Sequence, residues 1–497
     1  MQQRSSVQEL ANTLRDELKR YSPGEKLPSS RALVERHHVS PVTVSRALAA
    51  LVAEGLVSTR PGAGAFRAEP HPAGVPEGDT SWQTVALSAD TTAGGVPRSV
   101  DASGVLATLA TPPPGVLELS GGYLHASLQP ERAMAAALAR AGRRPGAWER
   151  PPIEGLPELR EWFAREIGGA TGSVAAAEVL ITAGGQSALT AALRALAPPG
   201  AAVLVESPTY AGMLAAARAS GLRPVPVPVD AEGVRPELLA EAFRASGARM
   251  FVCQPLFQNP TGAVLSAERG REVLRIARAA GAFVVEDDYA RRLVHEDAGP
   301  LPPTLASQDT DGVVVHLNSL TKATSPSLRV GALAARGPAL QRLRAIQVVD
   351  SFFVPRPLQE ATLELVGAPA WQRHLRTVAA ELRVRREALV AGLVREFGVS
   401  GAAGPAGPAG PAGPVITHIP AGGFHVWLRL PEAVDEAALM SAALRRGVAV
   451  GPGRPYFPAE PPAGYVRLSF IAVAGVGELA EGVRRLREAY EEVAGPL

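Results

Sequence analysis

Short runs of mainly apolar residues recur through the middle of this chain, and a stretch rich in Ala, Leu and Arg separates each run from the next. These runs lie at 179–182, 202–205, 250–253, 283–286 and 313–317. Strands that are apolar along most of their length are buried on both faces, and helical crossovers between them produce parallel pairing. The pattern therefore predicts an α/β domain with a mainly parallel sheet.

Composition divides the 497 residues into several parts, as a chain of this length leads us to expect. Residues 1–69 are predicted to form a separate charged module. Residues 70–115 are rich in Pro, Gly, Ser and Thr and are predicted to be a partly extended linker without a strong helix or strand. We place the large domain at 116–365 and a smaller α+β domain at 366–497. Its Gly-Pro-Ala repeat at 401–414 is too short for a stable collagen-like helix, so we expect a solvated loop.

Charge and cysteine content exclude several classes of protein. The formal net charge is only +2, so any nucleic-acid binding must come from a local basic surface. Cys253 is the single cysteine, which excludes an intrachain disulfide and is typical of a reducing compartment. The first residues are charged throughout, and no stretch approaches the roughly 18 apolar residues of a membrane span. We therefore expect a cytoplasmic protein without membrane contact.

The N-terminal module has the pattern of three helices followed by a wing. Helical spacing places four apolar residues on one face of the first helix: Val7, Leu10, Leu14 and Leu18. Ser29 is a candidate N-cap for a second helix, and Ser40, followed by Pro41, for a third that ends at Gly55. The third helix is predicted to bury Val44, Leu48, Leu51 and Val52. Residues 56–66 predict two short strands around a Gly-rich wing.

A helix-turn-helix with a wing is a DNA-binding arrangement, in which the exposed first half of the third helix enters a major groove. Phosphate contacts are expected near the start of the second helix and on the wing. The candidate DNA-binding residues are Ser29, Arg31, Val42, Thr43, Ser45, Arg46, Arg60, Gly62 and Gly64. The alternative is a small helical interaction domain with an ordinary charged surface.

Three motifs in the α/β region follow predicted strands. Gly184, Gly185 and Gln186 open a helix, where backbone N–H groups and the helix dipole favour a phosphate. Asn259 lies in a polar, proline-rich turn and has an amide that can donate to a ligand. The acidic run 286–288 ends a strand at the edge where open sheets bind ligands. We predict no metal, because no His or Cys lies close enough to complete a distinctive ligand set.

Lys322 stands out because it is the only lysine after Lys26, in a chain that otherwise uses arginine. An ammonium can lose its proton and form a Schiff base, whereas a guanidinium cannot. A lysine retained in such a region indicates chemistry at its amine, although an exposed surface lysine is the usual alternative.

The N-terminal motifs Gly24-x-x-Leu-Pro-Ser-Ser-Arg-x-Leu33 and Arg60-x-Gly-x-Gly-x-Phe66 resemble the winged-helix domain of the GntR family of bacterial transcription regulators. Pro41 stands where that family often has arginine, so operator preference cannot be transferred. The later motifs at 181–189, 253–262, 284–289 and 317–331 resemble fold-type-I aminotransferases, which bind pyridoxal 5′-phosphate (PLP).

The second resemblance implies a role for each matching residue. Lys322 would be the catalytic residue and hold the cofactor as a Schiff base, and Arg467 would grip an α-carboxylate bidentately. Asp287 would pair with the pyridine nitrogen, so that the ring acts as an electron sink. The implied cofactor-binding residues are Gly185, Gln186, Tyr210, Asn259, Asp287, Tyr289, Ser319, Lys322 and Arg329. Two residues depart from the family pattern: Arg150 replaces a tyrosine that reaches the neighbouring subunit's phosphate, and Thr321 replaces the commoner serine.

The two modules together resemble the MocR subfamily of regulators, a winged helix-turn-helix fused to an aminotransferase-like domain. The resemblance implies a homodimeric, PLP-dependent transcriptional regulator that binds a double-stranded DNA operator. It would sense PLP or an amino compound through aldimine chemistry at Lys322. One alternative is an active aminotransferase with a DNA-binding appendage, and another is a scaffold that does not bind PLP.

Overall fold

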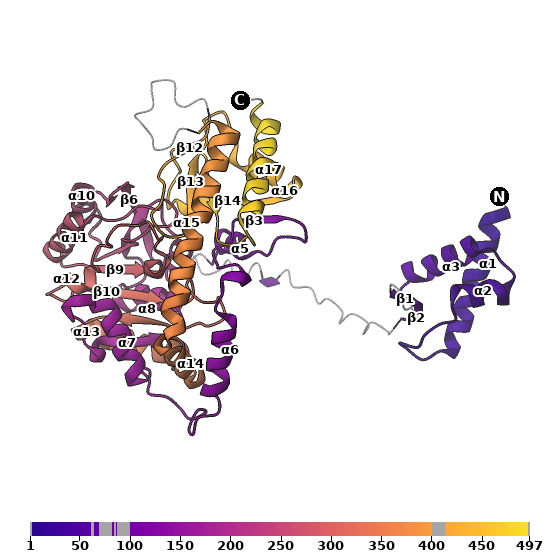
Figure 1. The fold of residues 1–497 in the computed structure, drawn as a ribbon, viewed down its shortest axis with the longest axis horizontal. Helices are drawn as coiled ribbons and strands as arrows, with labels where there is room; N and C mark the ends of the chain where they lie inside the picture. The colour runs from indigo at the N-terminus through magenta and orange to yellow at the C-terminus, as the bar shows by residue number, and fades with distance from the viewer. Residues whose placement is uncertain are drawn as a thin grey trace. The chain divides into compact units, whose positions relative to one another are not determined.

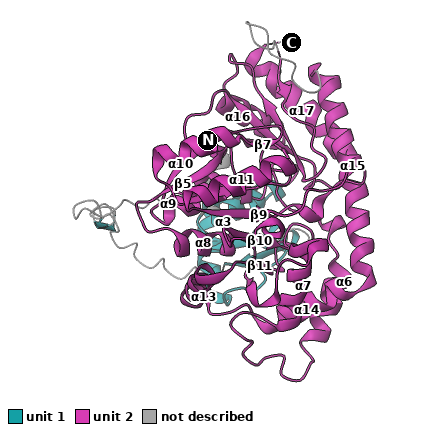
Figure 2. Cartoon of the chain, turned by 90° about the vertical axis from the view of Figure 1, so that its left-hand side faces the viewer, with its two compact units in different colours: residues 1–95 teal, residues 96–497 magenta. Residues whose placement is uncertain are grey.

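A computed structural model gives the fold in Figure 1. It describes residues 2–60, 64–68, 82–83, 86, 100–399 and 413–495, with only the backbone at 2–6, 53 and 60. Gly62, most of the predicted linker and nearly all of the Gly-Pro-Ala loop lie outside the described residues. The chain forms two compact units, 1–95 and 96–497, which Figure 2 colours separately.

The first unit is a three-helix module with a β-hairpin. Its elements are α1 (Gln2–Glu17), α2 (Ser30–His37), α3 (Pro41–Ala53), β1 (Val57–Arg60) and β2 (Gly64–Arg67). Ser29 caps α2 by accepting from the Ala32 N–H, and Ser40 caps α3 by accepting from the Thr43 N–H at 3.1 Å, as predicted. The predicted burial of Val52 is wrong: the residue is 39% exposed, because it lies at the edge of the buried stripe of α3 that Val44, Leu48 and Leu51 form.

An eight-stranded sheet forms the centre of the second unit, in the order β4-β11-β10-β9-β8-β5-β6-β7. These strands are β4 (Val179–Thr182), β5 (Ala202–Ser207), β6 (Arg223–Asp230), β7 (Gly233–Val234), β8 (Met250–Cys253), β9 (Phe283–Asp288), β10 (Val314–Ser319) and β11 (Gly331–Ala334). The neighbours from β10 through β6 are parallel, which confirms the predicted mainly parallel sheet.

Helices cover both faces of this sheet. One face packs against α8 (Gly185–Leu196), α9 (Ala211–Ala219) and α13 (Gly337–Ser351). The other packs against α7 (Pro157–Gly168), α10 (Pro236–Ser246), α11 (Ala267–Ala280) and α12 (Leu305–Gln308). Because side chains alternate along β9, Val285 packs on the α8 side and Val284 on the α11 side. Asp287 therefore shares the α8 face, while Glu286 and Asp288 share the opposite one.

A second, five-stranded sheet has the order β12-β13-β15-β14-β3. It contains β12 (Val415–Ile416), β13 (His425–Arg429), β15 (Tyr465–Ser469), β14 (Val448–Pro452) and β3 (Leu117–Leu119), with α15 (Pro369–Phe397), α16 (Glu436–Arg445) and α17 (Val476–Ala494). In Figure 1 the long helix α15 runs beside both sheets. Although β3 falls within the segment that the sequence assigns to the large domain, it pairs with β14 in this smaller sheet.

Part of the predicted linker is helical. Helix α5 (Ser103–Leu109) lies within 70–115, where we expected no strong helix, so that expectation is wrong for these residues. It contacts α9, and Val105 is half-buried, although Leu106 and Leu109 are exposed. A contact between segments so far apart in the sequence is not revealed by periodicity over seven residues. Two further α-helices of the second unit, α6 (Glu131–Ala141) and α14 (Arg356–Gly367), pack together. No helix in the described ranges is long and apolar enough to cross a membrane.

Gly331, the first residue of β11, lies where a side chain has no room. A Cβ on it would be 2.6 Å from the backbone oxygen of Asn318 and 3.2 Å from the Cα of Gly184. Both neighbours are backbone atoms, so neither can rotate away. Since Gly184 directly precedes α8, this close approach places the start of α8 beside the end of β10.

We expect Gly331→Ala to lower the free energy of unfolding by about 1–3 kcal/mol, because the new methyl group overpacks a rigid contact. Gly477→Ala is the matched control, since a Cβ at that position of α17 meets no atom within 4 Å. The control should be neutral or slightly stabilising, because alanine has the higher helix propensity. Urea unfolding of both variants measures the difference, and equal effects would contradict the close contact.

Candidate functional site

One cavity brings together the ten residues that the sequence predicts for the cofactor and the carboxylate. These are Gly185, Gln186, Tyr210, Asn259, Asp287, Tyr289, Ser319, Lys322, Arg329 and Arg467. Six of the ten lie at, or in the turns just after, the carboxyl ends of the parallel strands β5, β8, β9 and β10, the edge at which open sheets bind ligands. Arg467 comes from β15 of the smaller sheet, so the cavity lies between the two sheets of the second unit.

The start of α8 provides an anion-binding corner of this cavity. Gly184 precedes the helix with φ +86°, and the first-turn N–H groups at Gly185 and Gln186 have no partner within the helix. Arg329 donates from Nη2 to the Ala183 oxygen at 2.8 Å, and a Cβ on Gly184 would lie 3.0–3.2 Å from its guanidinium. Ser319, at the end of β10, lines the same corner.

Lys322 is partly buried beside the rings of Tyr123 and Phe424 and one backbone carbonyl group. Its Nζ donates to the Gly122 oxygen at 2.8 Å and lies 4.0 Å from the centre of the Tyr123 ring. Burial lowers the pKa of Lys322 to about 7, with further lowering by the positive charge of Arg467, against the opposing effect of Asp287. A substantial fraction of the amine is therefore neutral near pH 7 and able to act as a nucleophile.

Asp287 is an acidic residue of the same cavity. Burial raises its pKa to about 6, and a hydrogen bond from Gln254 acts against that rise. The carboxyl group is therefore still mostly ionised at neutral pH, and it lines the cavity with Lys322. Its ionised form suits a positively charged or protonated nitrogen.

Arg467 retains an unused hydrogen-bond donor. Its Nη1 donates to Asn259 Oδ1 at 3.4 Å, and its Nη2 donates to the Ser120 oxygen. Its Nε is buried and has no partner among the described residues, and the guanidinium carbon lies 5.4 Å from the centre of the Tyr456 ring. A buried donor without a partner is costly, so this arrangement suits an anionic ligand.

Two tyrosines of the site have their own packing partners. The Tyr210 ring lies against Gly212, where a Cβ would be 2.3 Å from the ring. Tyr289 donates its hydroxyl hydrogen to the Phe257 oxygen at 2.7 Å, so its oxygen remains available only as an acceptor. Asn259 is buried at the same edge of the cavity.

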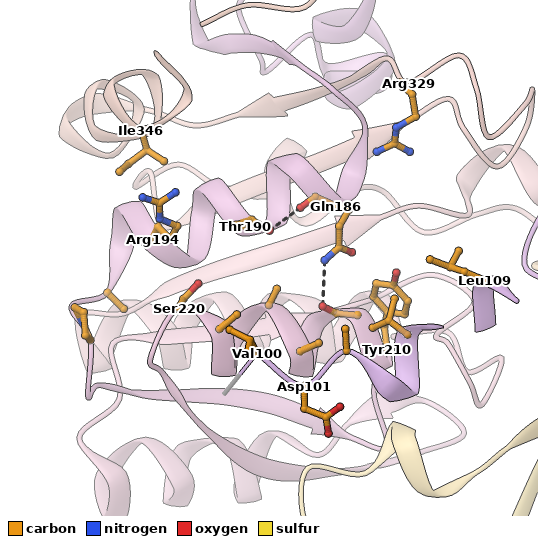
Figure 3. A pocket seen from close by; sticks show the side chains of 18 of the residues that line it. Val100, Asp101, Leu109, Gln186, Thr190, Arg194, Tyr210, Ser220, Arg329 and Ile346 are labelled. Carbon is orange, nitrogen blue, oxygen red and sulfur yellow. Dashed lines mark hydrogen bonds between the residues drawn. The ribbon is translucent and has the colours of Figure 1, made fainter. Parts of the chain in front are cut away.

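A second cavity of about 990 Å³ adjoins the first. It shares Leu109, Tyr123, Gln186, Tyr210 and Arg329 with the site. Figure 3 shows the side chains of α8 on one side of it, with Val100 and Asp101 on the other. Residues from the predicted linker therefore form part of the wall beside the anion-binding corner.

The predicted DNA-binding residues lie largely on the surface of the first unit. The Arg31 side chain is 92% exposed, Val42 is 60% exposed, and Ser45, Arg46 and Gly64 are also exposed. The Ser29 hydroxyl is engaged in capping α2, and the Thr43 hydroxyl is within 2.8 Å of the Ser40 hydroxyl. Gly62 and the Arg60 side chain lie outside the described residues.

Sequence reasoning missed several residues that line the site: Thr108, Leu109, Gly122, Tyr123, Leu189, Gln254, Phe424 and Tyr456. The sequence marked Thr321 only as a departure from the family pattern, but it also lines the cavity, and its Oγ1 is buried without a partner in the described part of the chain. Gln254 stands in the polar turn that also contains Asn259. Tyr123 and Tyr456 reach the cavity only through tertiary packing, so no local pattern marks them.

Known proteins support the same division of the chain. Residues 6–66 match the gntR family of bacterial regulatory proteins, and residues 116–486 match aminotransferase class I and II. YisV, an uncharacterised HTH-type transcriptional regulator of Bacillus subtilis, is 27% identical over 94% of this chain and 92% of its own length. A 2-aminoadipate transaminase of Thermus thermophilus is 33% identical over 76% of this chain and 91% of its own length.

The crystal structure of LysN, the α-aminoadipate aminotransferase of Thermus thermophilus, has the same fold. It was solved with N-(5′-phosphopyridoxyl)-L-leucine and is 29% identical to this chain. The TM-score is 0.71, over 83% of this chain and 98% of that one.

The fold and the cavity define a PLP-dependent, fold-type-I domain joined to a winged helix-turn-helix. The chain belongs to the aminotransferase class I and II family and has a gntR-type DNA-binding domain, the combination of the MocR subfamily of transcriptional regulators. PLP is the cofactor of this domain. The amine of Lys322, the carboxylate of Asp287 and the anion-binding corner at the start of α8 fit this cofactor.

We expect Lys322 in the cofactor-free protein to reach half-maximal acetylation by acetic anhydride near pH 7, as its lowered pKa requires. Arg467→Met should move this midpoint to higher pH, because it removes the largest charge that lowers the pKa. Arg446→Met, which removes an arginine paired with Glu488 away from the cavity, is the control. Mass spectrometry of the digested protein measures the labelling. A wild-type midpoint near the ordinary lysine value of about 10.4 would contradict the result.

Proposed function

We propose that the aminotransferase-like domain senses an amino compound through PLP held at Lys322, and that this controls operator binding by the winged helix. The observation that carries the proposal is the single cavity in which the amine of Lys322, with its lowered pKa, meets Asp287 and a buried Arg467 whose Nε has no partner among the described residues. PLP, when bound, supplies an electron sink that acidifies the substrate carbon.

The residues around the cavity would each hold one part of the cofactor. The N–H groups of Gly185 and Gln186, together with Ser319 and Arg329, would bind the phosphate. The hydroxyl of Thr321, which is buried and has no partner in the described ranges, supports adding this residue to the set. Asp287 would keep the pyridine nitrogen protonated, Asn259 and Tyr289 would bind the ring oxygen, and Tyr210 would stack on the ring.

Arg467 would bind the carboxylate of the effector. A guanidinium can pair with a carboxylate through two parallel hydrogen bonds, and its buried Nε has no other partner among the described residues. The effector class is therefore an amino acid, although PLP itself could act as the signal.

Residues 100–109 support a route from the cavity to the linker. They belong to the segment between the two domains in the sequence, and several of them line the cavities beside Arg329 and Gln186. A ligand that favours one arrangement of this wall would shift the equilibrium between two states of the linker. We infer that this shift repositions the DNA-binding module.

The homodimer is also part of the proposal. Trp148 is 82% exposed, an unusual exposure for a large aromatic side chain, and Arg150 is exposed two residues later. In a dimer, Arg150 would reach the partner's phosphate group, as the tyrosine at this position does in the aminotransferase family.

A working aminotransferase is the second candidate function. The 33% identity to a transaminase and the complete set of groups in the cavity favour it. The two candidates differ in whether the amino group is transferred and then returned.

We expect an amino acid to shift the absorption band of the PLP-loaded protein without converting the cofactor fully to its amine form. The amino acid should also change the affinity for a DNA duplex selected from random sequences. Lys322→Ala should abolish both responses and retain DNA binding, since Lys322 lies in the second unit. Conversion to the amine form that a 2-oxoacid reverses would instead establish an aminotransferase. If the amino acid does not change the affinity for the DNA duplex, the proposed role as an amino-acid sensor is wrong.

We expect Arg46→Ala to weaken DNA binding and to reduce the slope of log K against log salt by about 1, as the loss of one phosphate contact does. Arg15→Ala is the matched control, because this arginine is paired with Glu54 at the far end of α3. Fluorescence anisotropy of a labelled duplex at several salt concentrations measures both slopes. The docking model is wrong if the two variants have the same slope as the wild type.

A further inference from the structure

We propose that Gln254 is a positioning residue of the cofactor site, which orients Asp287 and Asn259 together through the two ends of its side-chain amide. The inference rests on the proposed cofactor site and assigns a role to a residue that does not itself need to contact PLP. Gln254 follows β8 directly and lines the cavity beside Asp287 and Asn259.

The amide of Gln254 joins the end of β9 to the turn that follows β8. Its Nε2 donates to Asp287 Oδ2 at 2.7 Å, and its Oε1 accepts from the backbone N–H of Asn259 at 3.1 Å. The two partners determine which way the amide faces, because an N–H can only donate and an ionised carboxylate can only accept. Reversing the amide would lose both bonds.

In this arrangement the two oxygens of the Asp287 carboxylate have different partners. The Oδ2 atom accepts from Gln254, so the ring nitrogen would take the other oxygen. The Asp287 carboxyl group is buried, and burial raises its pKa. Gln254 counteracts this with a neutral donor, which stabilises the ionised form without adding a charge to the cavity.

Gln254 is itself held in place by a buried acid. Its backbone N–H donates to Glu206 Oε2 at 3.0 Å, and Gln258 Nε2 donates to the same oxygen at 3.3 Å. Glu206 lies on β5, the strand next to β8, so the turn after β8 is fastened to the sheet. The position of the Gln254 amide therefore follows from the sheet and not from the ligand.

The hydrogen bonds continue to the effector side of the cavity. Arg467 Nη1 donates to Asn259 Oδ1 at 3.4 Å, and the Asn259 N–H donates to Gln254. Gln254 thus stands between the proposed carboxylate-binding arginine and the partner of the ring nitrogen. No charge is needed at position 254, because both of its contacts are satisfied by an amide.

We test the proposal with Gln254→Met, which keeps a similar volume and removes both amide contacts. We expect its Kd for PLP to rise about tenfold, the typical effect of losing one hydrogen bond to a charged group. We also expect the acidic limb of the pH profile of PLP affinity to move up by about one pH unit, because Asp287 becomes harder to ionise. Fluorescence titration of the cofactor-free protein with PLP measures both.

The other groups that influence Asp287 are the same in the variant and the wild type. They are Asp288 on the same strand, His316 on β10 and Lys322 in the turn after β10, together with Glu206, Tyr210, Cys253 and Tyr289. The ionisation of the PLP phosphate is also common to both proteins. A difference between the two profiles therefore reports the change at position 254.

Gln258→Met is the matched control. Gln258 lies in the same turn and bonds to Glu206, the Pro208 oxygen and Thr261, and none of its hydrogen bonds reaches Asp287. Its loss would lower PLP affinity at every pH and leave the acidic limb in place. If Gln254→Met does not fold, Gln254→Asn shortens the side chain by one methylene, and it should move the limb in the same direction.

A shift of the acidic limb of the PLP-affinity profile that occurs only in the position-254 variant supports the positioning role of Gln254. An unmoved limb, or an equal movement in the Gln258 control, overturns it, because both indicate a general effect on the turn. Failure of the wild-type protein to bind PLP would instead overturn the proposed cofactor site, which separates the two inferences.

Discussion

The desolvation of one lysine is the constraint on which the rest of the site depends. Removing an ammonium from water is unfavourable, and the positive charges of Arg467 and Arg329 increase that cost for Lys322. The amine therefore loses its proton readily, and Asp287 is the acid in its surroundings that opposes this loss. Two guanidinium groups and an amine in one cavity repel one another and need a rigid scaffold to hold them. The strands that end at the cavity, buried between two layers of helices, provide that scaffold.

Side chains alternate between the two faces of β9, so the acid that lines the cavity and the acids that stabilise the fold lie on opposite faces of the sheet. Asp287 faces the cavity, whereas Glu286 and Asp288 face the opposite layer. There Glu286 accepts from the N–H groups of Leu305 and Ala306 at the start of α12 and lies 2.8 Å from His316 Nδ1. A buried acid without such partners would destabilise the sheet. The polar network on the far face therefore permits three consecutive acids in one central strand, of which one is left for the ligand.

The two candidate functions, a regulator and an aminotransferase, use the same groups of the cavity. They differ in which other parts of the protein the cavity wall is connected to. Residues 100–109 join its wall to the segment that leads toward the DNA-binding module in the sequence. An enzyme needs that wall only to exclude water, whereas a regulator needs its position to depend on the ligand. The amide of Gln254, between the effector arginine and Asp287, gives the cavity a further internal connection of this kind.

The sequence by itself determined the class of fold and the residues of the chemical step. The apolar runs predict a sheet that is buried on both faces. Lys322, the only lysine after Lys26 in an arginine-rich chain, indicates chemistry at its amine. Only the tertiary structure decided that α5 forms, that Val52 is exposed, and that Tyr123, Tyr456 and Gln254 belong to the cavity. The physical reason is the distance along the chain over which each feature is decided. Apolar runs, helix caps and motifs can be recognised from neighbouring residues in the sequence. Burial and the orientation of a side-chain amide depend on distant segments that meet only after folding.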